Sequence, residues 1–212
     1  MDCHICEKKS KIFINEKTKI NYYDCQDCEY IFKSAENYQD FKTQKKRYDL
    51  HQNKDSDKQY EAYFQHFLDF VLPKISKAKT VLDFGCGAST LLAQMLEKKG
   101  FKSTYFDPIY YPEISLDEKK YDLIVSVEVF EHLSQPKETF AYLIEKLNTG
   151  GHLAIQTEFH PNNKEAFMSW YYPQDPTHIV FFRKKTFEVL AKDFSCNIVA
   201  DNGKNMIIIA KL

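Results

Sequence analysis

The sequence lacks an excess of charge of either sign and lacks any long apolar run. Its 29 Lys and Arg residues nearly balance 30 Asp and Glu residues, so the formal net charge is −1. A balanced charge gives no general electrostatic reason to bind nucleic acid. No stretch approaches the roughly 20 apolar residues that span a bilayer, and the polar residues 1–10 contain no apolar core of a secretory signal. We therefore expect no membrane partner and a cytoplasmic location.

The cysteines are concentrated near the N-terminus, in two Cys-x-x-Cys pairs. Cys3 and Cys6 form the first pair, Cys25 and Cys28 the second, and 18 residues separate the pairs. In a reducing compartment, paired cysteines are better explained as metal ligands than as disulfides. Two such pairs at the ends of a β-hairpin supply a tetrahedral four-thiolate site. We predict a structural Zn²⁺ ribbon over residues 1–33; free surface thiols are the alternative.

The remainder of the chain shows a change from a polar connector to alternating strands and helices. Residues 34–78 are predicted to form a helical connector or lid, and residues 79–212 an α/β domain. Within that domain, Asp201-Asn202-Gly203 indicates a closing hairpin. We predict a Rossmann-like, mostly parallel sheet of seven strands whose last strand is antiparallel. One short strand of the seven is expected within the ambiguous residues 107–120.

A strand-like run at residues 81–84 leads into a Gly-x-Gly turn at Gly85 and Gly87. Glycines at such a turn let the backbone bend sharply and approach a ligand closely. Asp107 follows 20 residues after Gly87 and ends the next predicted strand, where a carboxylate can bind ribose hydroxyls. A dinucleotide site requires a third small residue, but Thr90 occupies that position. The pattern therefore favours a nucleoside cofactor without a pyrophosphate.

The order of these motifs resembles that of the class I S-adenosylmethionine (SAM)-dependent methyltransferases. The resemblance runs from the glycine turn through Asp107 to Glu128-Val129-Phe130-Glu131-His132-Leu133 and Gly150-Gly151. It implies that SAM lies over the turn, with its ribose on Asp107, beside the loop after the fourth strand. The acidic residue that binds adenine in the family is not located, although Asp117 and Glu118 lie nearby. The implied cofactor contacts are Asp83, Phe84, Gly85, Cys86, Gly87, Asp107, Pro108, Glu128 and Val129.

A second local resemblance concerns Glu128, Glu131, His132 and His178. Glu-x-x-Glu-His followed by a distal His is similar to the small-RNA 2′-O-methyltransferases, and this similarity implies a divalent ion on these four residues. Glu-His-Leu also occurs in SAM enzymes that use no such metal. In that case Glu128 would border the cofactor, and His132 would either pack structurally or touch the acceptor. We predict His132, His178 and Glu131 as catalytic residues, with His132 or His178 contacting the acceptor or taking its proton.

The sequence gives weaker evidence for the residues that contact the acceptor. A wider set of bacterial methyltransferases resembles almost the whole chain, including a Tyr-x-x-His segment and a Trp…Asp-Pro-Thr-His segment, but implies no substrate. We predict acceptor contacts at Tyr48, His51, Trp170 and Tyr171, with core or lid packing as the alternative for the aromatic residues. The basic cluster that includes Arg47 is predicted to be a solvated helix face.

Three functions remain open. The first is a SAM-dependent methyltransferase acting on a small molecule, which the balanced charge favours. The second is an RNA or protein methyltransferase whose zinc ribbon holds the macromolecule. The third is a non-catalytic SAM-binding adaptor. The intact glycine turn, Asp107 and the Glu-His pairs argue against the third, because an inactive domain has no need of them.

Overall fold

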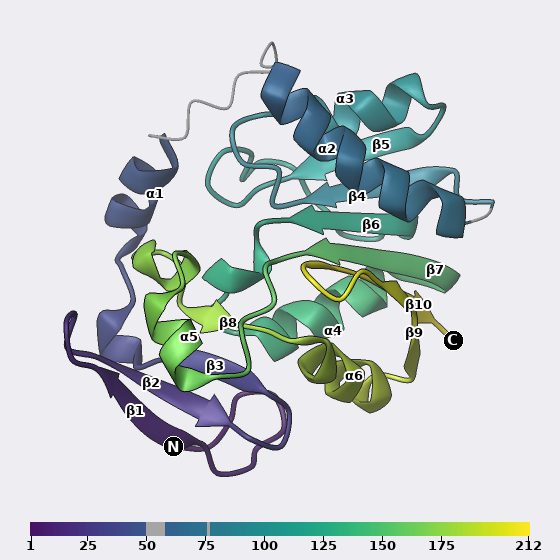
Figure 1. The fold of residues 1–212 in the computed structure, drawn as a ribbon. Helices are drawn as coiled ribbons and strands as arrows, with labels where there is room; N and C mark the ends of the chain where they lie inside the picture. The colour runs from purple at the N-terminus through teal and green to yellow at the C-terminus, as the bar shows by residue number, and fades with distance from the viewer. Residues whose placement is uncertain (50–57, 76) are drawn as a thin grey trace.

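The computed structural model describes residues 1–49, 58–75 and 77–212, and Figure 1 shows their fold. The larger of its two sheets has the strand order β5-β4-β6-β7-β10-β9. Strands β5, β4, β6 and β7 are parallel, whereas β10 runs antiparallel to both β7 and β9. The strands are β4 (Thr80–Phe84), β5 (Lys102–Phe106), β6 (Tyr121–Val127), β7 (Leu147–Gln156), β9 (Cys196–Asp201) and β10 (Met206–Lys211).

The predicted α/β class and the antiparallel last strand are confirmed, but the sheet has six strands among the described residues and not seven. The strand expected within residues 107–120 is replaced by turns. Pro108 and Pro112 lie in this segment and lack the N–H that a sheet ladder needs. Asp107 also accepts hydrogen bonds from the backbone N–H groups of Ile109 and Tyr110. Both features favour a turn over an edge strand.

Helices cover both faces of this sheet, and strand residues alternate between the two layers (Figure 1). Val81 faces the layer formed by α2 (Lys58–Val71) and α3 (Leu91–Lys98). Its neighbour Leu82 faces the layer formed by α4 (Pro136–Lys146) and α6 (Lys184–Asp193). Burying each such side chain contributes about 1.5–3 kcal/mol. The two apolar layers hold the carboxyl ends of β4, β5 and β6 at one edge, where the site lies.

The second sheet has the order β1-β2-β3-β8 and joins the N-terminus to a distant part of the chain. Strands β1 (Lys11–Asn15), β2 (Ile20–Cys25) and β3 (Tyr30–Lys33) form the ribbon. Strand β8 (Val180–Phe181) pairs with β3. Polar contacts reinforce this junction: Thr186 Oγ1 donates to the carbonyl oxygen of Cys28 at 2.9 Å, and Arg183 Nε lies 2.7 Å from a carboxylate oxygen of Glu29.

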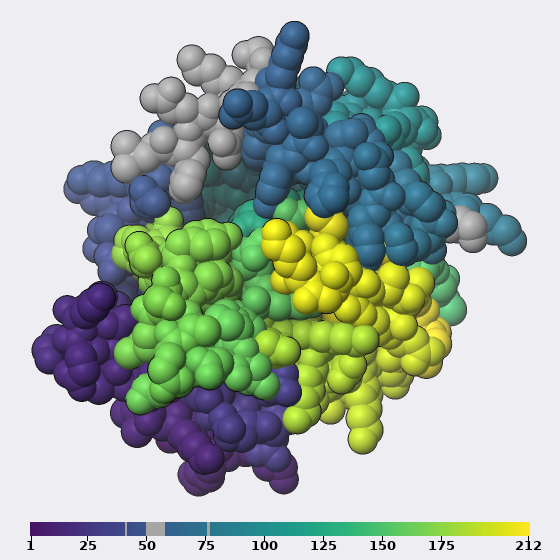
Figure 2. Space-filling model, in the orientation of Figure 1, coloured from purple at the N-terminus to yellow at the C-terminus, as the bar shows by residue number. Residues whose placement is uncertain are grey.

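The ribbon therefore packs as part of the larger body. Cys3, Cys25, Tyr30 and Phe32 belong to the same buried cluster as the residues under α4 and α6. Figure 2 shows the ribbon, in purple, lying directly against the green segment around α5 (Lys164–Ser169). The boundary predicted at residue 33 thus divides the sequence into segments that share one core.

The short elements complete the description. Helix α1 (Phe41–Asp49) follows the ribbon, within the predicted connector. In the described part of the chain, no helix combines the length and apolar character needed to cross a membrane. Four 3₁₀ turns occupy Ala35–Asn37, Leu72–Lys74, Phe130–His132 and Tyr172–Gln174.

Candidate active site

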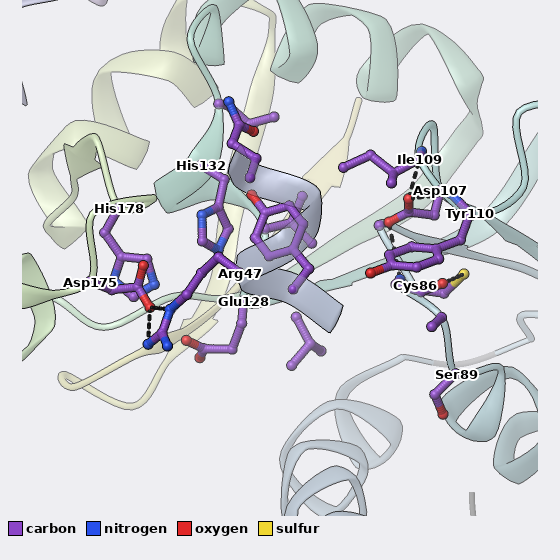
Figure 3. Close-up of a pocket in the computed structure, with 18 of the residues that line it drawn as sticks. Arg47, Cys86, Ser89, Asp107, Ile109, Tyr110, Glu128, His132, Asp175 and His178 are labelled. Carbon is purple, nitrogen blue, oxygen red and sulfur yellow. Dashed lines mark hydrogen bonds and ion pairs between the residues drawn. The ribbon is translucent and has the colours of Figure 1, made fainter. Parts of the chain in front are cut away.

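A cleft of about 1080 Å³ opens at the carboxyl edge of the parallel strands. Single-ligand pockets have volumes of roughly 300–1,000 Å³, so this cleft has room for a cofactor and a second small ligand. Figure 3 shows two groups of side chains on opposite sides of it, with Asp107 and Tyr110 on one side and His132 and His178 on the other. We call these the turn side and the histidine side.

The floor of the turn side is the backbone turn between β4 and α3. Gly85 and Gly87 both have positive φ angles, +80° and +64°. A Cβ atom on Gly85 would overlap the side chain of Val129, so only glycine fits there. A Cβ atom on Gly87 would meet nothing within 4 Å, and this residue lines the cleft. The turn therefore offers bare backbone to a ligand, as predicted for a cofactor cradle.

Asp107 holds the turn side together. Its Oδ2 accepts a hydrogen bond from the Gly87 N–H at 3.1 Å, and its Oδ1 accepts from the N–H groups of Ile109 at 2.8 Å and Tyr110 at 3.1 Å. A carboxylate has about four acceptor positions, so one remains for a ligand hydroxyl. This carboxylate lines the cleft, which is the position expected for a ribose contact.

The other predicted cofactor residues also line the cleft, with one exception. Phe84, Cys86, Pro108, Glu128 and Val129 contribute to its wall. Asp83 lies beneath the turn and is only 3% exposed. Burial, aided by the charge of Asp107, raises the pKa of Asp83 to about 7. Asp117 and Glu118, considered for adenine, are not among the lining residues, whereas Ile109 and Tyr110 are.

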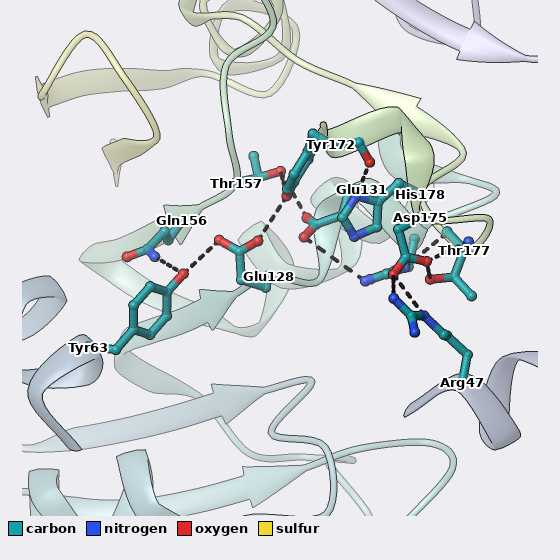
Figure 4. A network of polar contacts seen from close by, with 11 residues as sticks. Arg47, Tyr63, Glu128, Glu131, Gln156, Thr157, Tyr172, Asp175, Thr177 and His178 are labelled. Carbon is teal, nitrogen blue, oxygen red and sulfur yellow. Dashed lines mark hydrogen bonds and ion pairs between the residues drawn. The ribbon is translucent and has the colours of Figure 1, made fainter. Parts of the chain in front are cut away.

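Glu128 accepts hydrogen bonds from two tyrosines that belong to different elements (Figure 4). The Tyr63 hydroxyl on α2 donates to Oε1 and the Tyr172 hydroxyl donates to Oε2, both at 2.9 Å. Gln156 Nε2 in turn donates to the Tyr63 hydroxyl. Burial, followed by the charge of Glu131, raises the pKa of Glu128 to about 8. Glu128 also has a φ of +54°, a strained backbone conformation of the kind that clusters at functional sites.

Two imidazoles dominate the histidine side. His132 Nδ1 lies 2.9 Å from the carbonyl oxygen of Thr177, and His178 Nδ1 lies 2.9 Å from that of Tyr172. A carbonyl oxygen can only accept, so each Nδ1 carries a proton and each neutral ring keeps its lone pair on Nε2. Burial lowers the pKa of both groups, that of His178 to about 3. Both rings are therefore neutral near pH 7.

Glu131 lies behind the two imidazoles and is fully buried. Its Oε2 accepts from Thr157 Oγ1 at 2.8 Å. Its Oε1 has no hydrogen-bond partner in the described part of the chain and lies 4.0 Å from His132 Nε2. One ligand atom from each of Glu131, His132 and His178 falls within 4.8 Å of the others. Of the four ligands implied by the sequence, this cluster contains three, and Glu128 faces the tyrosines.

The predicted acceptor residues have different placements. Tyr48 and Tyr171 line the cleft, and the Tyr48 ring stands edge-on to His132 with centroids 5.2 Å apart. Trp170 is absent from the described lining of the cleft, and its ring stacks on that of Tyr172 with centroids 4.9 Å apart. His51 lies outside the described residues.

Sequence reasoning missed several residues of the cleft. Arg47, expected on a solvated face, forms an ion pair of 2.8 Å with Asp175, 128 residues away. In the same last turn of α1, Asp49 accepts a hydrogen bond from the Tyr110 hydroxyl at 2.8 Å. Helix α1 thus contacts both sides of the cleft. The only sequence signal was the placement of Asp175 two residues before the Thr177-His178 pair.

The four N-terminal cysteines form a separate cluster. The Sγ atoms of Cys3 and Cys28 lie 3.5 Å apart, those of Cys6 and Cys25 lie 3.4 Å apart, and all four fall within 4.8 Å. Tetrahedral zinc with Zn–S bonds of about 2.3 Å requires sulfur atoms about 3.8 Å apart. The Sγ separations lie on both sides of that value, so small changes in side-chain torsion would bring the four thiolates to a tetrahedral site.

Comparison with known proteins identifies the family of the chain. Residues 56–201 match the family model described as a methyltransferase domain. Among solved structures, an O-methyltransferase family protein from Burkholderia thailandensis is similar, with 13% identity, a TM-score of 0.50, and coverage of 79% of this chain and 62% of the other. The structure of TnmH gives 14% identity, a TM-score of 0.50, and coverage of 72% and 57%. This chain therefore spans less than two thirds of either protein, and at these identities the likeness concerns the fold alone. No curated protein matches the chain.

The geometry of the turn side leads to a prediction about cofactor binding. If the cofactor ribose contacts Asp107, Asp107→Ala should weaken binding of S-adenosylhomocysteine by roughly 10–100-fold, because a hydrogen bond to a charged group contributes about 1.5–3 kcal/mol. Isothermal titration calorimetry measures this loss. Asp117→Ala is the matched control and should bind like the unaltered protein, since Asp117 does not line the cleft. Equal affinities in both variants would remove Asp107 from the site.

Proposed function

Because the chain belongs to the methyltransferase-domain family, we propose that it transfers a methyl group from SAM to an acceptor bound beside His132 and His178. One observation carries the proposal: a side-chain-free glycine turn and a pair of neutral imidazoles face each other across the same cleft. The turn is suited to the cofactor, and the imidazoles are suited to an acceptor with a removable proton. Bound SAM supplies an electrophilic methyl group on its sulfonium.

The residues of the chain serve mainly to bind and orient the cofactor and the acceptor. The backbone at Gly85 and Gly87 supports the methionine part of the cofactor, and Asp107 binds the ribose. In-line methyl transfer depends chiefly on holding the acceptor atom close to the methyl carbon and aligned with the breaking bond. The acceptor atom bonds to the methyl carbon as the carbon–sulfur bond breaks and its electron pair goes to sulfur. A hydroxyl acceptor must also lose a proton, for which Nε2 of His132 or His178 is available.

The geometry favours a divalent cation at Glu131, His132 and His178 over a base acting alone. Metal-binding histidines typically donate their second ring N–H to a carbonyl or carboxylate, and both rings here do so. Glu131 Oε1 is buried without a partner in the described part of the chain, an arrangement that costs about 1–3 kcal/mol unless something binds there. Two imidazoles and a carboxylate suit several transition metals. A cation held there would make an acceptor hydroxyl easier to deprotonate.

A small acceptor is the better-supported class. Helix α1 contacts both sides of the cleft through Arg47 and Asp49, so a macromolecule would have to displace it. The ribbon is tied to the body through β8 and does not stand apart as a separate binding module. The adaptor alternative is disfavoured by Glu131, because a buried oxygen without a partner among residues 1–49, 58–75 and 77–212 is a cost that a purely structural domain would not need.

The cysteine cluster generates a metal prediction. We infer that it holds Zn²⁺, so elemental analysis of the purified full chain should give about one zinc ion per cluster. Cys28→Ala should lose that zinc and destabilise the ribbon, because the ion contributes directly to its folding. Cys196→Ala is the control, since Cys196 is a buried cysteine outside the cluster. Metal-free protein whose residues 1–33 remain protected from hydrogen exchange would contradict the assignment.

The histidine side leads to a second prediction, which is tested on protein whose four-cysteine cluster already holds zinc. Added Co²⁺ should give the visible absorption of a bound ion with nitrogen and oxygen ligands. His132→Ala and His178→Ala should each abolish this signal, whereas His66→Ala, at an exposed position on α2, should retain it. Once an acceptor is identified by labelled-methyl capture, the two cleft variants should lose about 10²–10⁴-fold in rate. Absence of a cobalt signal from the unaltered protein would exclude a cation at Glu131, His132 and His178. Normal methyl transfer by both His132→Ala and His178→Ala would show that neither histidine is catalytic.

A further inference from the structure

A buried lysine connects the ribbon to the histidine side of the cleft. Lys33 is the last residue of β3 and is only 1% exposed. Its backbone N–H donates to the carbonyl oxygen of Ile179 at 2.8 Å. Its ammonium Nζ donates to the carbonyl oxygens of Pro173 at 3.5 Å and Asp175 at 3.4 Å. An ammonium group is costly to bury without acceptors, and these two carbonyl oxygens offset part of that cost.

The segment that Lys33 contacts, residues 172–178, also orients both imidazoles. The carbonyl oxygen of Tyr172 accepts from His178 Nδ1, and that of Thr177 accepts from His132 Nδ1. The carbonyl oxygens held by Lys33 lie between these two in the sequence. A shift of the segment would therefore move both carbonyl oxygens away from the ring nitrogens and leave the tautomers undefined.

The side chain of Asp175 does not replace Lys33 in this task. Its carboxylate accepts from Arg47 on α1 and from the N–H and hydroxyl of Thr177. These contacts hold the segment from the cleft side and within itself. The contacts of Lys33 come from the ribbon side, through β3. The segment is thus held from two directions by residues that are far apart in the sequence.

We propose that Lys33 is a positioning residue of the active site, through which the ribbon fixes residues 172–178 and thereby the orientation of His132 and His178. The ribbon then acts as a support for the acceptor side of the cleft. The importance of this positioning for catalysis rests on the proposed function, but the positioning itself does not.

The test compares Lys33→Met with the unaltered full chain. Methionine retains the length and apolar stem of lysine but has no donor. Nitrogen-15 NMR of labelled histidines at fixed neutral pH reports which ring nitrogen carries the proton. We expect the Nδ1-protonated form of His132 and His178 to dominate in the unaltered chain and to lose its dominance in Lys33→Met. Amide exchange at residues 177–179 should become about tenfold faster, as expected from loss of one hydrogen bond to a charged group.

The matched control is Lys11→Met, which removes an exposed lysine from β1 of the same ribbon and should change neither measurement. Unaltered tautomers and exchange rates in folded Lys33→Met would overturn the proposal. If that variant does not fold, the unaltered chain still provides a test. Its Lys33 ammonium protons should exchange with water far more slowly than those of surface lysines, and equally fast exchange would also overturn the proposal. Neither measurement requires methyl transfer, so failure of the proposed function is distinguishable from failure of this one.

Discussion

Two hydrogen bonds from imidazole to backbone determine the chemistry available in the cleft. By donating Nδ1–H to the carbonyl oxygens of Thr177 and Tyr172, His132 and His178 are fixed in the tautomer that leaves Nε2 unprotonated. The Glu131 oxygen that has no hydrogen-bond partner among the described residues lies 4.0 Å from one of these nitrogens, His132 Nε2. Three donor atoms are thereby gathered opposite the glycine turn. The other features described for the site either place these groups or form the glycine-turn wall on the opposite side of the cleft.

Each of the two sheets positions a different part of the site. The parallel strands bring the glycine turn, Asp107 and Glu128 to one edge, because successive parallel strands end on the same side. The pairing of β3 with β8 brings the ribbon against the segment that precedes β8. That segment contains His178 and the carbonyl groups that both histidines need. The ribbon is thus coupled to the cleft by main-chain pairing and by the buried ammonium of Lys33.

Local patterns made much of this predictable. The strand and glycine turn at residues 81–87, the Asp107 position and the closing hairpin depend on neighbouring residues, and the structure has them where the sequence indicated. The expected seventh strand failed because two prolines and an aspartate-stabilised turn compete with strand formation. Arg47, Tyr63 and Lys33 could not be placed, since their partners lie far along the chain. The stacking of Trp170 on Tyr172 could not be predicted either, because an aromatic residue in a motif gives no sign of which face it packs on.

The most direct test of the central claim is a crystal structure of the full chain with S-adenosylhomocysteine. We expect the ribose hydroxyls to contact Asp107 and the sulfur to lie over Gly85 and Gly87. We also expect the open side of the sulfur, where SAM carries its methyl group, to face Nε2 of His132 and His178. A ligand bound outside the cleft, or one whose sulfur faces away from both imidazoles, would contradict the proposed function.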